Sequence, residues 1–176
     1  LIPGVWTFHG LGGGAFADGV LQAMGSQLSS VAVVDLDVDG DLDLVATDSG
    51  ELALIRFGHD DGTFDPPVGY EVGYSPGAMS VGDVDGDGDQ DLVVRSSGNN
   101  GVPQGLQLVR NEGDGRFRAA AGVPMTSGDA DAIGDLDGDG HPDLASATFH
   151  ADAFASWNDG HGRLLPGPSV DLRGGG

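Results

Sequence analysis

Three acidic stretches of one pattern decide how this chain folds. They read DLDVDGDLDL at residues 35–44, DVDGDGDQDL at residues 83–92 and DLDGDGHPDL at residues 135–144. All three fit D-x-D-x-D-G-x-x-D-L, and they begin 48 and 52 residues apart. A solvated acidic surface would keep neither this spacing nor a glycine at the sixth position, so the stretches belong to repeated units.

A second motif repeats in step with the first. The pattern G-x-F/L occurs at residues 14–16, 62–64, 115–117 and 162–164, with spacings of 48, 53 and 47 residues. A shared period of about 50 residues is typical of propeller blades, solenoid turns and related arrays.

Short apolar segments separated by glycine-rich turns surround the acidic stretches. The clearest is ELALIRF at residues 51–57, which alternates apolar and polar residues as a strand does. Strands are predicted at residues 30–34, 42–47, 51–57 and from Phe64; at 78–82, 92–95, 106–110 and from Phe117; and at 132–134, 144–148, 154–157 and from Leu164. Four short antiparallel strands per repeat make a propeller blade, so we predict an all-β fold of β-propeller blades.

The repeat divides the chain into about three and a half blades. Residues 1–27 are predicted to hold the outer strands of a partial blade, with a third strand at residues 5–8. Complete blades, each with an acidic stretch, follow at residues 28–76, 77–127 and 128–176. Because closed propellers have about 4–8 blades, we expect the chain to be part of a larger propeller, with assembly of several copies as the alternative.

The acidic stretches have the side chains of a calcium-binding loop. Carboxylates at positions one, three, five and nine can point toward one ion, the sixth glycine permits the bend, and the seventh residue offers its carbonyl. The predicted ligands are Asp35, Asp37, Asp39, Asp41 and Asp43; Asp83, Asp85, Asp87, Asp89 and Asp91; and Asp135, Asp137, Asp139, His141 and Asp143. Magnesium demands stricter octahedral geometry, so we predict three calcium ions.

An EF-hand is the nearest alternative for such a loop. It needs a glutamate at position twelve and flanking helices, whereas position twelve here is Ala46, Val94 or Ser146. We expect the leucine that follows each ninth-position aspartate to point into the core, and the ring of His141 to face solvent.

Composition excludes several kinds of partner, covalent cross-link and metal site. The 176 residues carry 28 acidic and 7 basic side chains, for a net charge of −21, which disfavours nucleic acid. The absence of cysteine excludes disulfides and thiolate metal sites. No run of 18 apolar residues occurs, so direct membrane insertion is not expected.

The acidic loops, together with NEGDGRF at residues 111–117, resemble FG-GAP/VCBS repeats of integrin-alpha-like calcium-binding β-propellers. The resemblance implies that each loop joins the first and second strands of a blade, and that positions one, three, five and nine supply ligands. Integrin repeats carry a G-A-P-like segment near the loop. This chain has VAT, VVR and ASA at 45–47, 93–95 and 145–147, which is closer to the VCBS type.

No catalytic arrangement stands out. The five histidines are scattered and no G-x-S-x-G elbow occurs, so we expect no enzyme activity. We expect Trp6, Trp157, Tyr70 and Tyr74 to pack between blades rather than to stack on a sugar.

Two function classes remain. The first is a non-catalytic module for extracellular binding or adhesion, with a protein or glycan ligand held by turns such as residues 95–105. The second is a structural propeller within a secreted enzyme or a multi-subunit complex, whose partners are the remaining blades or neighbouring subunits. Weak, exposed calcium sites fill outside the cell, so we expect a secreted, cell-surface or periplasmic protein.

Overall fold

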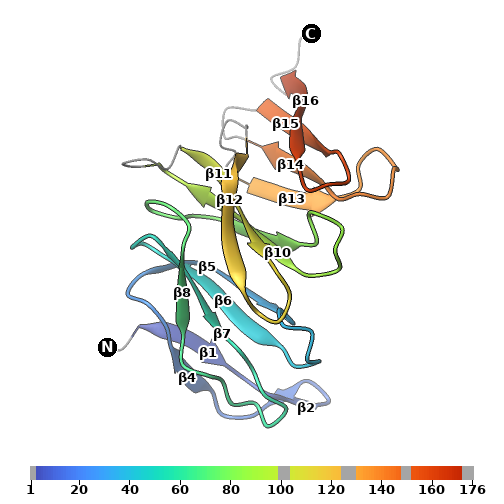
Figure 1. Ribbon diagram of the computed structural model, residues 1–176. Helices are drawn as coiled ribbons and strands as arrows, with labels where there is room; N and C mark the ends of the chain where they lie inside the picture. The colour runs from blue at the N-terminus through green and yellow to red at the C-terminus, as the bar shows by residue number, and fades with distance from the viewer. Residues whose placement is uncertain (1–2, 99–103, 124–129, 148–151, 172–176) are drawn as a thin grey trace.

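The computed structural model describes residues 3–98, 104–123, 130–147 and 152–171. In these residues the regular structure is entirely β, and the sheets follow one another in chain order (Figure 1). The strands are β1 (Gly4–Thr7), β2 (Gly10–Gly12), β3 (Ala15–Phe16), β4 (Val20–Ala23), β5 (Leu28–Val34), β6 (Asp43–Asp48), β7 (Leu52–Arg56), β8 (Val68–Glu71), β9 (Met79–Gly82), β10 (Asp91–Ser96), β11 (Gly105–Asn111), β12 (Phe117–Val123), β13 (Ala130–Gly134), β14 (Asp143–Ala147), β15 (Asp152–Asn158) and β16 (Leu164–Asp171).

Three sheets each contain four consecutive strands. Strands β5–β8 form blade 1, β9–β12 form blade 2 and β13–β16 form blade 3, and each strand pairs antiparallel with the next. This up-and-down order within small sheets is that of propeller blades, and it confirms the predicted fold class. Each acidic stretch lies between the first and second strands of its blade.

The region before blade 1, which we call the partial blade as predicted from the sequence, contains two two-stranded sheets. Strand β1 pairs with β4, and β2 pairs with β3 in a short hairpin between them. Their positions match blade 1 at an offset of 48 residues: β1 corresponds to β7, β4 to β8, and the Gly10–Phe16 pair to the Gly58–Phe64 bridge. The strands of the partial blade are therefore equivalent to the third and fourth strands of a complete blade.

The hydrophobic core is divided among the spaces between successive sheets. Val45, Ile55, Leu92 and Val94 belong to the cluster between blades 1 and 2. Val93, Leu106, Leu108, Leu144 and Leu164 belong to the cluster that joins blade 2 to blade 3. A smaller cluster with Met24, Leu44, Ala46 and Leu54 joins the partial blade to blade 1. In blades 1 and 2 both faces of the second strand are thus covered, which explains its nearly continuous apolar sequence.

The leucine after each ninth-position aspartate is buried, as predicted. Leu44, Leu92 and Leu144 are at most 2% exposed. Their burial fixes the start of the second strand and therefore the place where each acidic loop ends.

The fourth strand of blade 1 differs from the sequence prediction. It begins at Val68, after Pro66 and Pro67, and not at Phe64, which forms only an isolated bridge with Gly58. Proline has no N–H to donate to a ladder, so the paired strand starts once the two prolines have passed. In blades 2 and 3 the fourth strand does begin at Phe117 and Leu164.

Candidate metal centres

The first aspartate of each acidic loop holds the loop in shape. We number the loops 1 (residues 35–44), 2 (83–92) and 3 (135–144). In each, the amide of the sixth-position glycine donates to Oδ2 of the first aspartate at 3.0–3.1 Å: Gly40 to Asp35, Gly88 to Asp83 and Gly140 to Asp135. These glycines have φ of 92–101°, which only glycine adopts at low cost.

The aspartate at position five of each loop stabilises the second half of the turn. Its Oδ1 accepts a hydrogen bond from the amide two residues later at 2.8–3.0 Å: Asp41 to Asp39, Asp89 to Asp87 and His141 to Asp139. Aspartate favours this local bond, which is one reason for its use in turns.

The aspartate at position nine of each loop has a structural role that was not predicted from the sequence. Its Oδ2 accepts the amide of the second loop residue at 2.7–2.9 Å: Leu36 to Asp43, Val84 to Asp91 and Leu136 to Asp143. Its Oδ1 accepts a second hydrogen bond, at 2.8–2.9 Å, from a backbone amide at the end of the third strand or just after it. The pairs are Gly58 to Asp43, Asn111 to Asp91 and Asn158 to Asp143. One buried carboxylate therefore ties the loop to the third strand in every complete blade.

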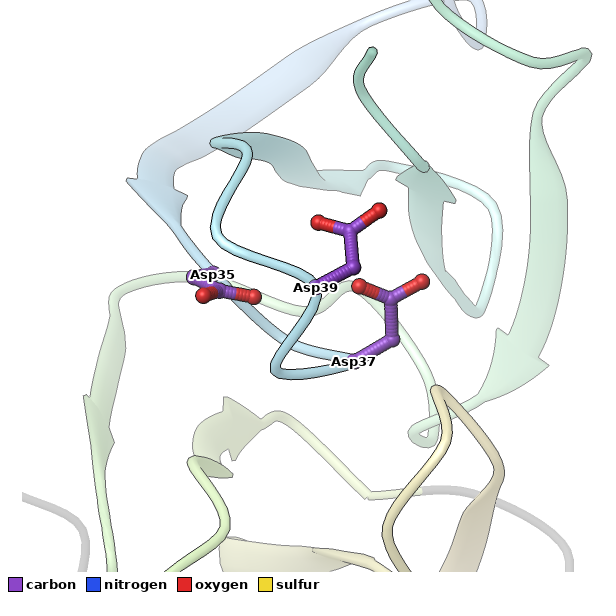
Figure 2. Close-up of side chains that lie close together, drawn as sticks. All are labelled: Asp35, Asp37 and Asp39. Atoms are coloured by element: carbon purple, nitrogen blue, oxygen red, sulfur yellow. The ribbon is translucent and has the colours of Figure 1, made fainter. Parts of the chain in front are cut away.

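Three aspartates gather in each loop. Carboxylate oxygens lie within 4.8 Å of one another in the sets Asp35–Asp37–Asp39, Asp83–Asp85–Asp91 and Asp135–Asp137–Asp143. Figure 2 shows loop 1, where Asp37 and Asp39 project to the same side and Asp35 lies across the turn. These three groups could hold metal ions.

Buried oxygens without a protein partner test whether a cation fits. Oδ1 of Asp35, Oδ1 of Asp37 and Oδ1 of Asp85 are buried and accept no hydrogen bond. Buried polar atoms are normally satisfied, and leaving a charged one unpaired is costly. Carboxylate oxygens that face one another without donors are the ligand chemistry of a hard cation, so the residues fit one.

The acidities of these groups reflect the same crowding. Burial, and then the neighbouring carboxylate of Asp39, raise the pKa of Asp37. Burial and Asp87 likewise raise the pKa of Asp85. Burial raises the pKa of Asp91 to about 6, although two backbone amides oppose the shift. The carboxylates are thus held in sites that disfavour their charge unless a cation is bound.

The predicted ligands are brought together only in part. Each set holds the aspartates at positions one and three of its loop. The remaining member is the aspartate at position five in loop 1 and the aspartate at position nine in loops 2 and 3. Asp43, Asp87 and Asp139 lie outside the sets of their own loops. The residues predicted to contribute carbonyls, Asp41, Asp89 and His141, take part in the turn through their amides.

Loop 1 differs from the others at its fourth position. Gly86 and Gly138 have φ of 78° and 83° there, and their amides donate to the first aspartate at 2.7 Å. Loop 1 has Val38 with φ of 61°, which is strained for a β-branched residue. Oδ1 of Asp35 has no such donor.

The His141 ring does not project freely into solvent, contrary to the sequence prediction. It is half-buried against the turn at residues 158–162 of its own blade. A Cβ placed on Gly160 would lie 2.6 Å from Nε2 of His141, so the ring packs directly on that glycine.

Two asparagines connect neighbouring blades, and the sequence analysis did not identify this role. Nδ2 of Asn111 in blade 2 donates to the carbonyl of Leu36 in loop 1 at 2.6 Å. Asn158 in blade 3 makes the equivalent bond to the carbonyl of Val84 in loop 2. The signal was present, because N-x-G-x-G-x-F/L occurs at both 111–117 and 158–164.

An open groove of about 730 Å³ lies between the partial blade and blade 1. It is lined by residues of both, including Val5, Thr7, Val31, Val33 and Leu42. Val31 and Val33 are 52% and 58% exposed, whereas Met79 and Val81, 48 residues later, pack against the core between blades 1 and 2.

Of the predicted packing aromatics, Tyr70 packs edge-on against Phe117 with ring centroids 5.2 Å apart, and Trp157 is half-buried. Trp6 and Tyr74 are instead at least half exposed. Of the turn at residues 95–105 that was predicted to reach a partner, residues 99–103 lie outside the described part of the chain. The described residues contain no helix long and apolar enough to cross a membrane.

Sheets and loops together define a repeat protein of propeller blades with an acidic loop in each complete blade. A family model described as an FG-GAP-like repeat matches residues 35–94 and 83–146. Each match starts at the first aspartate of one loop and ends two residues after the next loop, and together they span more than half of the chain. The chain belongs to the FG-GAP-like repeat family. A search of curated proteins gave no significant match.

Proposed function

We propose that this chain is a non-catalytic, calcium-binding β-propeller module that binds a protein or glycan outside the cell. Metal binding is supported by the buried carboxylate oxygens of Asp35, Asp37 and Asp85 that accept no hydrogen bond. Each belongs to a group of three converging aspartates.

Calcium suits these loops better than magnesium does. Calcium accepts six to eight oxygen ligands at variable angles and commonly binds several carboxylates together with a backbone carbonyl. Magnesium retains its water and requires near-octahedral geometry, which a set of three aspartates does not supply by itself. Calcium binding would also lower the mutual repulsion of carboxylates in a chain of net charge −21.

Binding of a partner, and not catalysis, is the activity that the loops favour. Half of the acidic residues lie in stretches where a cation would hold them ionised, which removes them as general acids. The FG-GAP-like family is typical of extracellular proteins, where calcium is abundant enough to fill sites with dissociation constants near 10⁻⁴–10⁻³ M. We therefore place the protein at the cell surface, in the medium or in the periplasm.

Isothermal titration tests the metal part. Protein stripped with chelator should bind calcium with a dissociation constant of about 10⁻⁴–10⁻³ M and magnesium more weakly. Glycan-array screening in calcium, repeated with chelator, tests the binding part. Calcium-independent turnover of any substrate would show that the class is wrong.

The open groove favours a second candidate, a structural role within a larger propeller. Val31 and Val33 are exposed, whereas the equivalent Met79 and Val81 pack against the core between blades 1 and 2, where β9 contacts β5, the first strand of blade 1. Within the described strands, β1 pairs only with β4, whereas every other third strand has a neighbour on each side. The occupant that fits is a hairpin of first and second strands with its acidic loop.

A peptide with the sequence of residues 28–48 tests this candidate, because it contains those elements of blade 1. Binding of this peptide to the full chain should change the fluorescence of Trp6. The substitution Val31→Asp in the full chain, with the peptide unchanged, should weaken that binding. The exposed loop 3 residue Leu136 provides the matched control, Leu136→Asp. Equal binding to both variants, or no binding, would remove this candidate.

A further inference from the structure

The residue at the end of each third strand contacts the next blade. His9, Phe57 and Arg110 occupy equivalent positions, and each packs against the glycine of the next G-x-F/L motif: Gly62, Gly115 and Gly162. A Cβ on any of these glycines would collide with that side chain, and all three have φ of 70–76°. The contact recurs along the chain, while the chemistry of the residue that makes it changes.

Arg110 is the cationic member of this series beside an acidic loop. Its Nη1 lies 3.2 Å from Oδ2 of Asp85, at the third position of loop 2. Its Nη2 donates to the carbonyl of Gly162 in blade 3 at 2.7 Å. Asp85 and Arg110 are 15% and 33% exposed, so the ion pair is largely shielded from solvent.

The equivalent place beside loop 1 holds no charge. Phe57 lies there, and Gly115 packs between its ring and the Cβ of Asp37. In loop 3 the equivalent residue is Trp157. Loop 2 therefore has Asp85 paired with a guanidinium, whereas the sequence repeat has aromatic residues, Phe57 and Trp157, at the equivalent positions for the other two loops.

We propose that Arg110 makes loop 2 the weakest of the three cation sites and links its occupancy to the packing of blade 3 on blade 2. A divalent ion in loop 2 either shares Asp85 with the guanidinium and is repelled by it, or displaces it. Displacement would disturb the bond to Gly162, which joins the two blades. Loops 1 and 3 have no such competitor at this position.

The inference rests on the proposed calcium binding, and single-site proteins separate the two. Asp37→Asn with Asp137→Asn leaves loop 2 intact, while Asp85→Asn with Asp137→Asn leaves loop 1. Calcium titration of each should show binding to loop 2 about tenfold weaker than to loop 1, because one positive charge beside a divalent ion costs about that much in partly solvated surroundings.

Arg110→Met in the loop 2 protein should restore roughly that factor of ten. Arg118→Met is the matched control, since Arg118 is exposed and pairs with Glu112 instead of with a loop aspartate. The reciprocal change, Phe57→Arg in the loop 1 protein, should weaken calcium binding there and gives an independent answer if Arg110→Met is poorly folded. Melting in chelator, where Arg110→Met should lower the melting temperature, reports the apo role of the ion pair.

The outcomes are distinct. No calcium binding by either single-site protein would refute the proposed function. Two results would overturn the role of Arg110 and leave the proposed function standing. One is calcium binding of equal strength in the two single-site proteins. The other is an Arg110→Met protein that binds calcium no tighter than its parent, together with no effect of Phe57→Arg.

Discussion

Nδ2 of Asn111 donates a hydrogen bond to the carbonyl of Leu36 at 2.6 Å, across 75 residues of sequence. The same nitrogen reaches the carbonyl of Gln90 in its own blade at 3.3 Å. The Asn111 amide N–H donates to Asp91, so one residue joins loop 1, loop 2 and the third strand of blade 2. The acidic loops are therefore part of the contact between blades, and loop order and blade packing should depend on each other.

Replacing Asn111 by alanine should destabilise the protein by about 1–3 kcal/mol, because buried carbonyls lose their donor. Urea unfolding in calcium measures the change. Gln104→Ala, at an exposed position, should shift stability by less than about 0.5 kcal/mol. A loss for Asn111→Ala no larger than that of the control would show that the bond does not join the blades.

Val38→Gly should stabilise the protein. The positive φ of Val38 costs about 1–2 kcal/mol, and the extra freedom of glycine in the unfolded chain offsets about 0.5–1 kcal/mol, so a net gain near 0.5–1 kcal/mol is expected. The reverse change in loop 3, Gly138→Val, should destabilise. Thermal melts of both variants in chelator measure the effect without a contribution from metal, and a loss of stability in Val38→Gly would contradict the strain.

Asp37→Ala should reduce stability in calcium but not in chelator. At 10 mM calcium, a site with a dissociation constant of 10⁻⁴–10⁻³ M contributes about 1–3 kcal/mol of stability, which this variant should lose. Without metal, the variant also removes a carboxylate that repels its neighbours, so no loss is expected. Asp18→Ala, an exposed change outside the loops, is the control; equal melting shifts for the two variants in calcium would argue against a metal in loop 1.

The strand pattern and the loop positions could be predicted from sequence because each depends on local residues. Alternating apolar residues, glycine at the bend and leucine after the last aspartate act within a few positions of one another. The start of β8 was misplaced because Phe64 resembled its counterparts, while the two prolines after it remove ladder donors.

The contacts between blades could not be derived in the same way. Asn111 and Asn158 act on carbonyls 74–75 residues away, and a motif match shows recurrence without showing the partner. The double hydrogen bonding of Asp43 and its two equivalents was missed because a ninth-position carboxylate was interpreted only as a ligand. Arg110 could have been noticed by aligning the repeats, where it replaces aromatic residues.

Stability of the metal-free protein should fall as pH rises from about 4 to 7. Burial raises the pKa of Asp91 from 3.8 to about 6 in the folded state, so the folded protein binds this proton more tightly than the unfolded chain. The resulting stabilisation is complete below about pH 3.8 and is lost as pH rises through about 6. Asp37, Asp43 and Asp85 shift in the same direction.

Melting temperatures in chelator at several pH values measure this trend. Asp91→Asn should flatten it, since the variant has no proton to lose at that position. In saturating calcium the trend should weaken or reverse, because the cation binds the ionised carboxylates. Stability in chelator that stays constant or rises over this range would contradict the predicted shifts.

The number of calcium ions bound per chain tests the account most directly. Anomalous scattering from crystals grown in calcium should place one ion in each acidic loop, three in total, with loop 2 filling last as calcium is raised. Solution calorimetry on the same protein should give the same stoichiometry. Millimolar calcium that leaves all three groups of aspartates empty would contradict the central claim that these loops are metal sites.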